Sequence, residues 1–118
     1  MNFNTVYPTL HCPACNEVVD SGVGFSVGAL TQHAYKIGDE LNWQTKGEIT
    51  CRPAQKPANG NIKTVGYFNC DNTKCPSWQD CFPVVQLALI EIKNNKIVSV
   101  EVFDPPAQVD EFAIVEMD

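Results

Sequence analysis

The chain has 118 residues, of which 44% are apolar, and it contains no run of about 18 or more apolar residues, which excludes a transmembrane helix. Residues 1–8 carry neither a basic stretch nor a long apolar one, so we expect no secretory signal, a cytoplasmic location and one domain over residues 1–118. The net charge of −6 and the single arginine, Arg52, disfavour a nucleic-acid partner, because phosphate-binding surfaces use several basic side chains on one face.

Two cysteine pairs dominate the sequence. Cys12 and Cys15 are separated by two residues, and Cys70 and Cys75 by four, so each pair can present two sulfurs to one point. In a reducing compartment such spacing favours a metal over disulfides. The four cysteines therefore predict a tetrahedral Zn²⁺ site, structural because four thiolates leave no coordination position for water or substrate.

The other candidate ligands have different interpretations. Cys81 follows Cys75 by six positions and is an alternative to one member of the second pair. Cys51 is expected to be a small buried apolar side chain at the end of a strand. His11 precedes Cys12 and would point to the opposite side of an extended backbone, so we expect a neighbour of the site and not a ligand.

Extended structure is expected between the two pairs. Alternating apolar side chains over residues 23–27 predict a short strand interrupted by glycine. Residues 31–50 predict strands around a turn at Gly38-Asp39, with Ile37, Leu41 and Trp43 reaching one core. Residues 52–63, with two prolines and Asn-Gly, predict a surface loop, and residues 64–69 a strand that leads to Cys70.

A hairpin is the clearest secondary-structure signal. Residues 84–93 and 96–103 are rich in β-forming side chains and are joined by Asn94-Asn95, a pair that tolerates positive φ. The first arm is apolar enough for a central strand covered on both faces. In the second arm, Val98, Val100 and Val102 predict the buried face. Residues 76–83 are expected to be irregular, and residues 107–118 to form either a short helix or an edge strand.

The fold class that follows is mostly β. Cys15 and Cys70 are separated by 54 residues, 16–69. We therefore predict a zinc ribbon with an inserted antiparallel β layer and a C-terminal β hairpin. Closing so long a loop restricts the unfolded chain, so the metal is expected to contribute to folding itself.

The two cysteine motifs, with Tyr67-Phe68 before the second one, resemble the ribbons of phage Ogr/Delta-type activators and the C-terminal ribbons of bacterial type I topoisomerases. The resemblance covers some 20 residues and implies Cys12, Cys15, Cys70 and Cys75 as zinc ligands. The long insertion and the scarcity of basic residues depart from that pattern, so DNA binding is not implied. A second resemblance, through residues 35–39 between two knuckles, is to small bacterial immunity-type proteins encoded beside toxins.

No catalytic constellation is evident, since the chain has only two histidines and its carboxylates are scattered. We therefore expect a non-enzymatic zinc protein that binds another protein, plausibly an immunity protein that neutralises a basic toxin domain. Residues 101–118 hold six acidic side chains and no basic one. The expected contact residues are Trp43, Trp78, Glu101, Asp104, Asp110 and Glu111.

Two alternatives remain open at this point. A nucleic-acid-binding ribbon would use Lys63 and Lys74 with Tyr67 or Phe68. A redox protein would use Cys12-Pro13-Ala14-Cys15, which is similar to a thioredoxin-type motif, although that motif normally begins a helix. A solvated acidic end that only aids solubility is the simplest explanation of the charge.

Overall fold

The computed structural model describes residues 4–27, 34–43, 59–72, 74–76, 78–79, 82–83, 86–103 and 114–117. Within these ranges every regular element is a strand, so the prediction of a mostly β protein is confirmed. The structure has no helix there with the length and apolar character needed to cross a membrane. Cys51, Cys81, Asp104, Asp110 and Glu111 lie outside the described residues.

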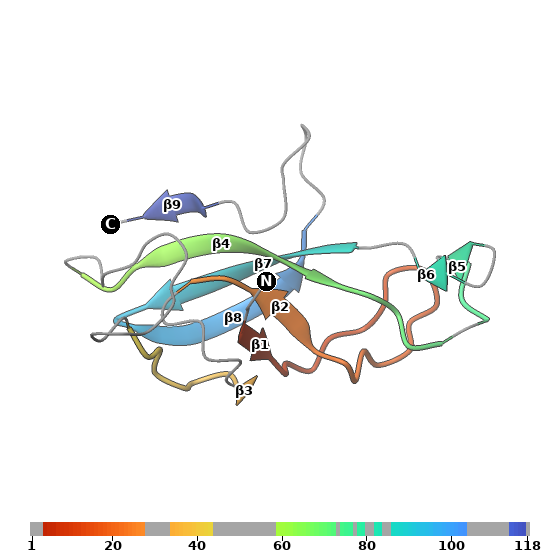
Figure 1. Cartoon of the computed structure of the whole chain (residues 1–118), viewed down its shortest axis with the longest axis horizontal. Coiled ribbons are helices and arrows are strands. Elements are labelled where there is room, and N and C mark those ends of the chain that lie inside the picture. Colours follow the sequence, from red (N-terminus) through yellow and green to blue (C-terminus); the bar gives the residue numbers. More distant parts are fainter. Residues whose placement is uncertain are drawn as a thin grey trace.

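One mixed sheet holds seven of the nine strands (Figure 1). Six of them follow the order β3-β1-β2-β4-β7-β8, and β9 pairs with β4 beside this path. Their bounds are Asn4–Val6 for β1, Val23–Phe25 for β2, Ala34–Tyr35 for β3, Ile62–Phe68 for β4, Gln86–Lys93 for β7, Lys96–Val102 for β8 and Ile114–Met117 for β9. The short strands β5, Trp78–Gln79, and β6, Phe82–Pro83, pair separately. The expectation of irregular structure over residues 76–83 was therefore wrong for residues 78–79 and 82–83.

The predicted inserted layer and C-terminal hairpin form a single sheet. Strand β4, from the insertion, pairs along its whole length with β7 of the hairpin. Strand β1, which precedes the first cysteine pair, lies between β2 and β3 and runs parallel to β3, so the layer is mixed and not purely antiparallel. Residues 114–117 pair with β4, so this part of the segment 107–118 is a strand and not a helix, and residues 107–113 lie outside the described residues.

The hairpin turn follows the prediction. Asn94 and Asn95 have φ values of 51° and 67°, the left-handed conformation that a two-residue turn between twisted strands requires. Strand β7 is central, as predicted, but its two faces differ. Ala88, Ile90 and Ile92 are buried on one face, whereas the alternate side chains are only partly buried on the other.

A bulge in β8 corrects the predicted face of that strand. Glu91 lies opposite Ser99, but Ile92 lies opposite Ile97, so Val98 is an extra residue on β8. The bulge turns Ile97 into the core and leaves Val98 41% exposed. The alternation of apolar residues predicted Val98 on the buried face, because a one-residue bulge cannot be recognised from that pattern.

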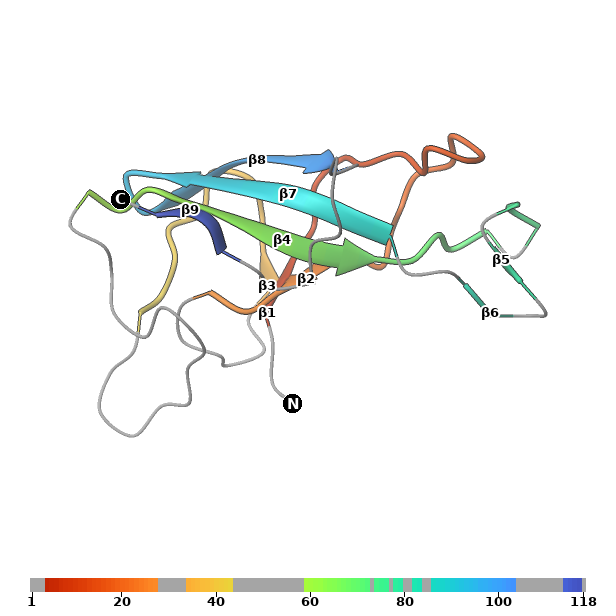
Figure 2. The same cartoon turned by 90° about the horizontal axis from the view of Figure 1, so that it is seen from above.

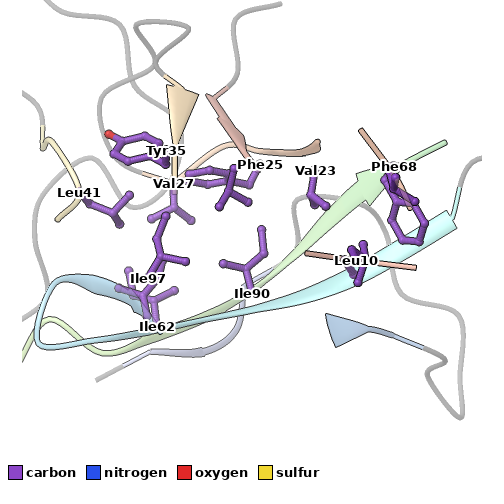
Figure 3. Packing of buried hydrophobic residues seen from close by; sticks show 14 of the residues in the cluster. Leu10, Val23, Phe25, Val27, Tyr35, Leu41, Ile62, Phe68, Ile90 and Ile97 are labelled. Carbon is purple, nitrogen blue, oxygen red and sulfur yellow. The ribbon is translucent and has the colours of Figure 1, made fainter. Parts of the chain in front are cut away.

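The core packs between β2, β4, β7 and the segment of residues 34–43 (Figure 3). Phe25 and Tyr35 contact each other with ring centroids 5.7 Å apart. Leu41 is buried and Trp43 packs partly against this core, as predicted for both. Ile37 is 45% exposed, so its predicted core position was wrong. It lies in the turn itself, next to Gly38, whose φ is 96°.

The two cysteine segments lie at the end of the sheet away from the β7–β8 turn (Figures 1 and 2). Leu10 and Val19 are 6% and 3% exposed and continue the core toward them. At the other side of the junction, Phe68 ends β4 with 2% exposure, two residues before Cys70. Both cysteine segments are therefore connected to the sheet through residues that are buried in the core.

Candidate metal centre

The first cysteine pair lies in a tight hairpin. The backbone N–H of Val19 donates to Leu10 O over 2.8 Å, and that of Cys12 donates to Glu17 O over 2.8 Å. Asn16 closes the turn with a φ of 63°. The chain thus reverses around Cys12 and Cys15 and leaves as an extended segment, without the helix that a thioredoxin-type motif begins.

The second pair follows β4 directly. The N–H of Cys75 donates to Asn72 O over 2.9 Å, and the N–H of Lys74 donates to Asn72 Oδ1 over 3.0 Å. These bonds fold the longer C-x₄-C spacing into a turn that returns Cys75 to Cys70. The four residues between the cysteines are accommodated because one side-chain oxygen replaces a backbone acceptor.

Asp71 joins the two cysteine segments. Its Oδ2 accepts hydrogen bonds from the backbone N–H groups of Asp20, over 2.5 Å, and Ser21, over 3.1 Å. Asp20 and Ser21 follow the first hairpin, so this carboxylate fixes the second pair beside it. The role of Asp71 was not predicted, and its position next to Cys70 is the only feature of the sequence that points to it.

All four predicted ligand sulfurs meet at one point. The Sγ atoms of Cys12, Cys15, Cys70 and Cys75 lie within 4.8 Å of one another. Two contacts cross between the pairs: Cys12 Sγ to Cys75 Sγ is 3.6 Å, and Cys15 Sγ to Cys70 Sγ is 3.5 Å. In a tetrahedral zinc site with Zn–S bonds of about 2.3 Å, neighbouring sulfurs are about 3.8 Å apart. The cluster therefore has the size of a four-thiolate metal site, and all four cysteines are free thiols.

Several hydrogen-bond donors surround the Cys12 sulfur. Burial raises the pKa of Cys12, but hydrogen bonds from the Gln86 side chain, the N–H groups of Ala14 and Cys15 and the Cys75 thiol together outweigh it. The pKa of Cys12 falls to about 6 as a result. Gln86 Nε2 lies 3.6 Å from Cys12 Sγ, so the first residue of β7 reaches the site. Backbone N–H groups directed at a sulfur are the arrangement that a metal-bound thiolate requires.

The pKa of Cys70 is shifted in the opposite direction. Burial raises the pKa of Cys70, the N–H of Asn72 partly opposes this, and the neighbouring thiols of Cys15, Cys12 and Cys75 raise it further, to about 12. The cluster without a cation therefore retains protons on some sulfurs while others ionise. A divalent cation removes this conflict, because its charge favours the deprotonated form of every ligand.

The remaining predicted site residues take other places. His11 is exposed and its Nδ1 lies 3.1 Å from Asn16 O, beside the hairpin and outside the sulfur cluster. Trp43 donates its indole N–H to Asn95 Oδ1 and is partly buried. Trp78 pairs with Pro83 through the backbone, and Glu101 is exposed on β8.

The residues of the nucleic-acid alternative are largely occupied by the fold. Phe68 is 2% exposed and has no face free for a base. The ring of Tyr67 lies against Gly24, where an added Cβ would meet it at 2.7 Å. Lys63 Nζ lies 3.5 Å from Glu91 Oε2, so its charge is partly balanced within the sheet.

Comparison of the chain with protein-family models, with curated proteins and with solved structures gives no match. Among the described residues, the feature that indicates a function is the group of four cysteines that can hold a metal ion.

Proposed function

We propose that the protein binds one Zn²⁺ through Cys12, Cys15, Cys70 and Cys75, and that the ion is structural. The convergence of four thiols within 4.8 Å, from segments that are remote in sequence, carries this proposal. Four soft thiolate donors suit zinc better than magnesium or calcium, and a filled tetrahedron leaves no position for a substrate. The ion would hold the end of β4 against the hairpin that precedes β2.

Metal analysis of the purified protein tests this proposal. We expect about one zinc per chain. Cys70→Ser should lose the zinc and most of the stability, because the remaining three thiolates bind the metal much less tightly. Cys51→Ser and Cys81→Ser should keep both, and they serve as matched controls. Iron in place of zinc, or zinc lost from Cys81→Ser and kept in Cys70→Ser, would contradict the proposed ion or its ligands.

For the role in the cell, we propose that the protein binds a basic protein surface and acts as an immunity protein for a toxin domain. The support is the excess of acidic residues in the segment 101–118, together with the scarcity of arginine. Glu101 is exposed on β8, where its carboxylate is accessible to a basic partner.

Capture of partners from the native host tests this role. The wild-type protein is compared with a variant in which four acidic residues are replaced by their amides: Glu101, Asp104, Asp110 and Glu111. We expect a basic protein to be retained by the wild type and lost by the variant. Retention of nucleic acid, with an affinity that falls steeply with salt, would favour the alternative of a nucleic-acid-binding ribbon. Equal capture by both proteins would exclude the acidic segment as the contact surface.

A further inference from the structure

The four cysteines of the candidate metal centre differ in their exposure to solvent. Cys12, Cys70 and Cys75 are 1%, 2% and 3% exposed, whereas Cys15 is only partly buried. Cys15 is therefore the residue of the four that is most accessible to a reagent from solution. Reactivity of metal-bound cysteines is decided mainly by this access, because all four are deprotonated when the ion is bound.

Hydrogen bonds also lower the expected reactivity of Cys12. Cys12 Sγ accepts from Gln86 Nε2 and from two backbone N–H groups, and such bonds lower the nucleophilicity of a thiolate. Cys15 Sγ lies 3.5 Å from Cys70 Sγ, which belongs to the other cysteine segment. A disulfide needs a separation of about 2.05 Å, so these two atoms need to approach by about 1.5 Å.

We propose that Cys15 is a site of oxidation by hydroperoxides and that the product is a disulfide between Cys15 and Cys70, with release of the zinc ion. This inference rests on the proposed function, because it concerns the reactivity of the same four ligands. It adds a chemical class of reactant, the residue that meets it first and the residue that completes the reaction.

The reaction has two steps. The Cys15 thiolate attacks the O–O bond of the peroxide, one oxygen remains on sulfur as a sulfenic acid, and the other leaves as hydroxide. The Cys70 thiolate then attacks the Cys15 sulfur, forms the S–S bond and displaces hydroxide. Two electrons pass from the two sulfurs to the peroxide, and the metal loses two of its four ligands in one event.

The bond would join the two cysteine segments in place of the metal. Cys15 precedes β2 and Cys70 follows β4, and these strands are neighbours in the sheet. The oxidised protein would therefore retain a covalent closure of residues 16–69 after the ion has gone. Loop closure restricts the unfolded chain whether an ion or a disulfide provides it.

The test uses zinc-loaded protein treated with hydrogen peroxide, with zinc release followed by a chromogenic chelator and disulfides mapped by mass spectrometry after proteolysis. We expect one zinc released for each Cys15–Cys70 disulfide formed. A first disulfide within Cys12–Cys15, or between Cys12 and Cys75, would overturn the inference.

Two variants provide a matched comparison. Cys15→His retains a zinc ligand but removes the accessible sulfur, so peroxide should release zinc about ten-fold more slowly than from the wild type. Cys75→His changes a buried ligand to the same residue and should release zinc at nearly the wild-type rate. Equal rates for the two variants would contradict the assignment of Cys15. Less than one zinc per wild-type chain before oxidation would contradict the proposed function, whereas a full complement with a different disulfide contradicts only this inference.

Discussion

Gln86 Nε2 donates a hydrogen bond to Cys12 Sγ across 3.6 Å. The two residues are 74 positions apart, and the bond connects the first residue of β7 to the first cysteine of the candidate metal centre. Groups that hydrogen-bond to metal ligands orient them and adjust their basicity. The large sheet therefore influences the site through a side chain that is not a ligand.

Replacing Gln86 by Leu should weaken zinc binding by roughly ten-fold, because the substitution removes the N–H donor and retains most of the apolar volume. Competition with a chelator of known affinity measures the change. Gln86→Glu should weaken binding further, since a carboxylate near four thiolates adds repulsion and offers no N–H. Unchanged zinc affinity in both variants would show that the contact has no role in the site.

The pKa of Cys12, lowered from 9.0 to about 6, gives the metal-free fold a defined dependence on pH. Between these values the unfolded chain holds the Cys12 proton and the folded chain does not, so the contribution of Cys12 to the free energy of unfolding rises from pH 6 to pH 9. It is lost as the pH falls toward 6. Cys70, with its pKa raised to about 12, acts in the opposite sense and loses its contribution as the pH rises above 9.

Urea unfolding of the metal-free, reduced protein at several pH values measures this dependence. We expect the free energy of unfolding to be greatest near pH 9. At this pH the contribution of Cys12 has reached its full value and that of Cys70 has not yet begun to fall. Cys12→Ser should abolish the rise below pH 9 and leave the fall above it. A stability that decreases steadily from pH 6 to pH 9 in the wild type would contradict the lowered pKa of Cys12.

Asn95 connects the β7–β8 turn to the segment of residues 38–43. It is 4% exposed, accepts the indole N–H of Trp43 and donates to Glu40 Oε1 over 3.1 Å and to Leu41 O over 3.3 Å. Asn95→Gly keeps the positive φ accessible but removes these three bonds. We expect a loss of about 2 kcal/mol in the free energy of unfolding, because the buried Leu41 carbonyl and the partly buried Trp43 indole lose a hydrogen-bond partner, whereas the exposed Glu40 can bond to water.

Asn94→Gly is the matched control for this loss. Asn94 also has positive φ, but its side chain is exposed, and its N–H bond to Asn61 Oδ1 comes from the backbone. Its stability should stay within about 0.5 kcal/mol of the wild type or increase. Equal effects of the two glycine substitutions in chemical denaturation would show that the turn needs only its backbone conformation.

Gly66 lets β2 and β4 approach each other closely. A Cβ at this position would lie 2.6 Å from Val23 Cγ1 and 2.7 Å from the backbone oxygen of Gly24. Because a backbone atom cannot move aside as a side chain can, Gly66→Ala should destabilise the fold by about 2 kcal/mol or more. A Cβ at Gly38 would meet no atom within 4 Å, so only the φ of 96° disfavours alanine there. Gly38→Ala should therefore lower the free energy of unfolding by about 1 kcal/mol. Thermal unfolding of both variants measures the difference, and a milder effect at Gly66 would contradict this close approach.

The sequence predicted the elements that local patterns define. The Asn94-Asn95 turn and the four clustered cysteines belong to this group, because turn chemistry and ligand spacing act over a few residues. The bulge at Val98, the parallel pairing of β1 with β3 and the contact between Gln86 and Cys12 depend on partners far along the chain. Such long-range register is fixed by packing, which no local periodicity contains.

Strand β4 has partners that come from both sides of it in the chain. It pairs with β2 and β9 along one edge and with β7 along the other. During synthesis all four cysteines of the candidate metal centre have been made once residue 75 is added, whereas β7 is added later, over residues 86–93. A metal ion bound by these cysteines at that stage would order the growing polypeptide while β4 still has an unpaired edge, before the sheet closes.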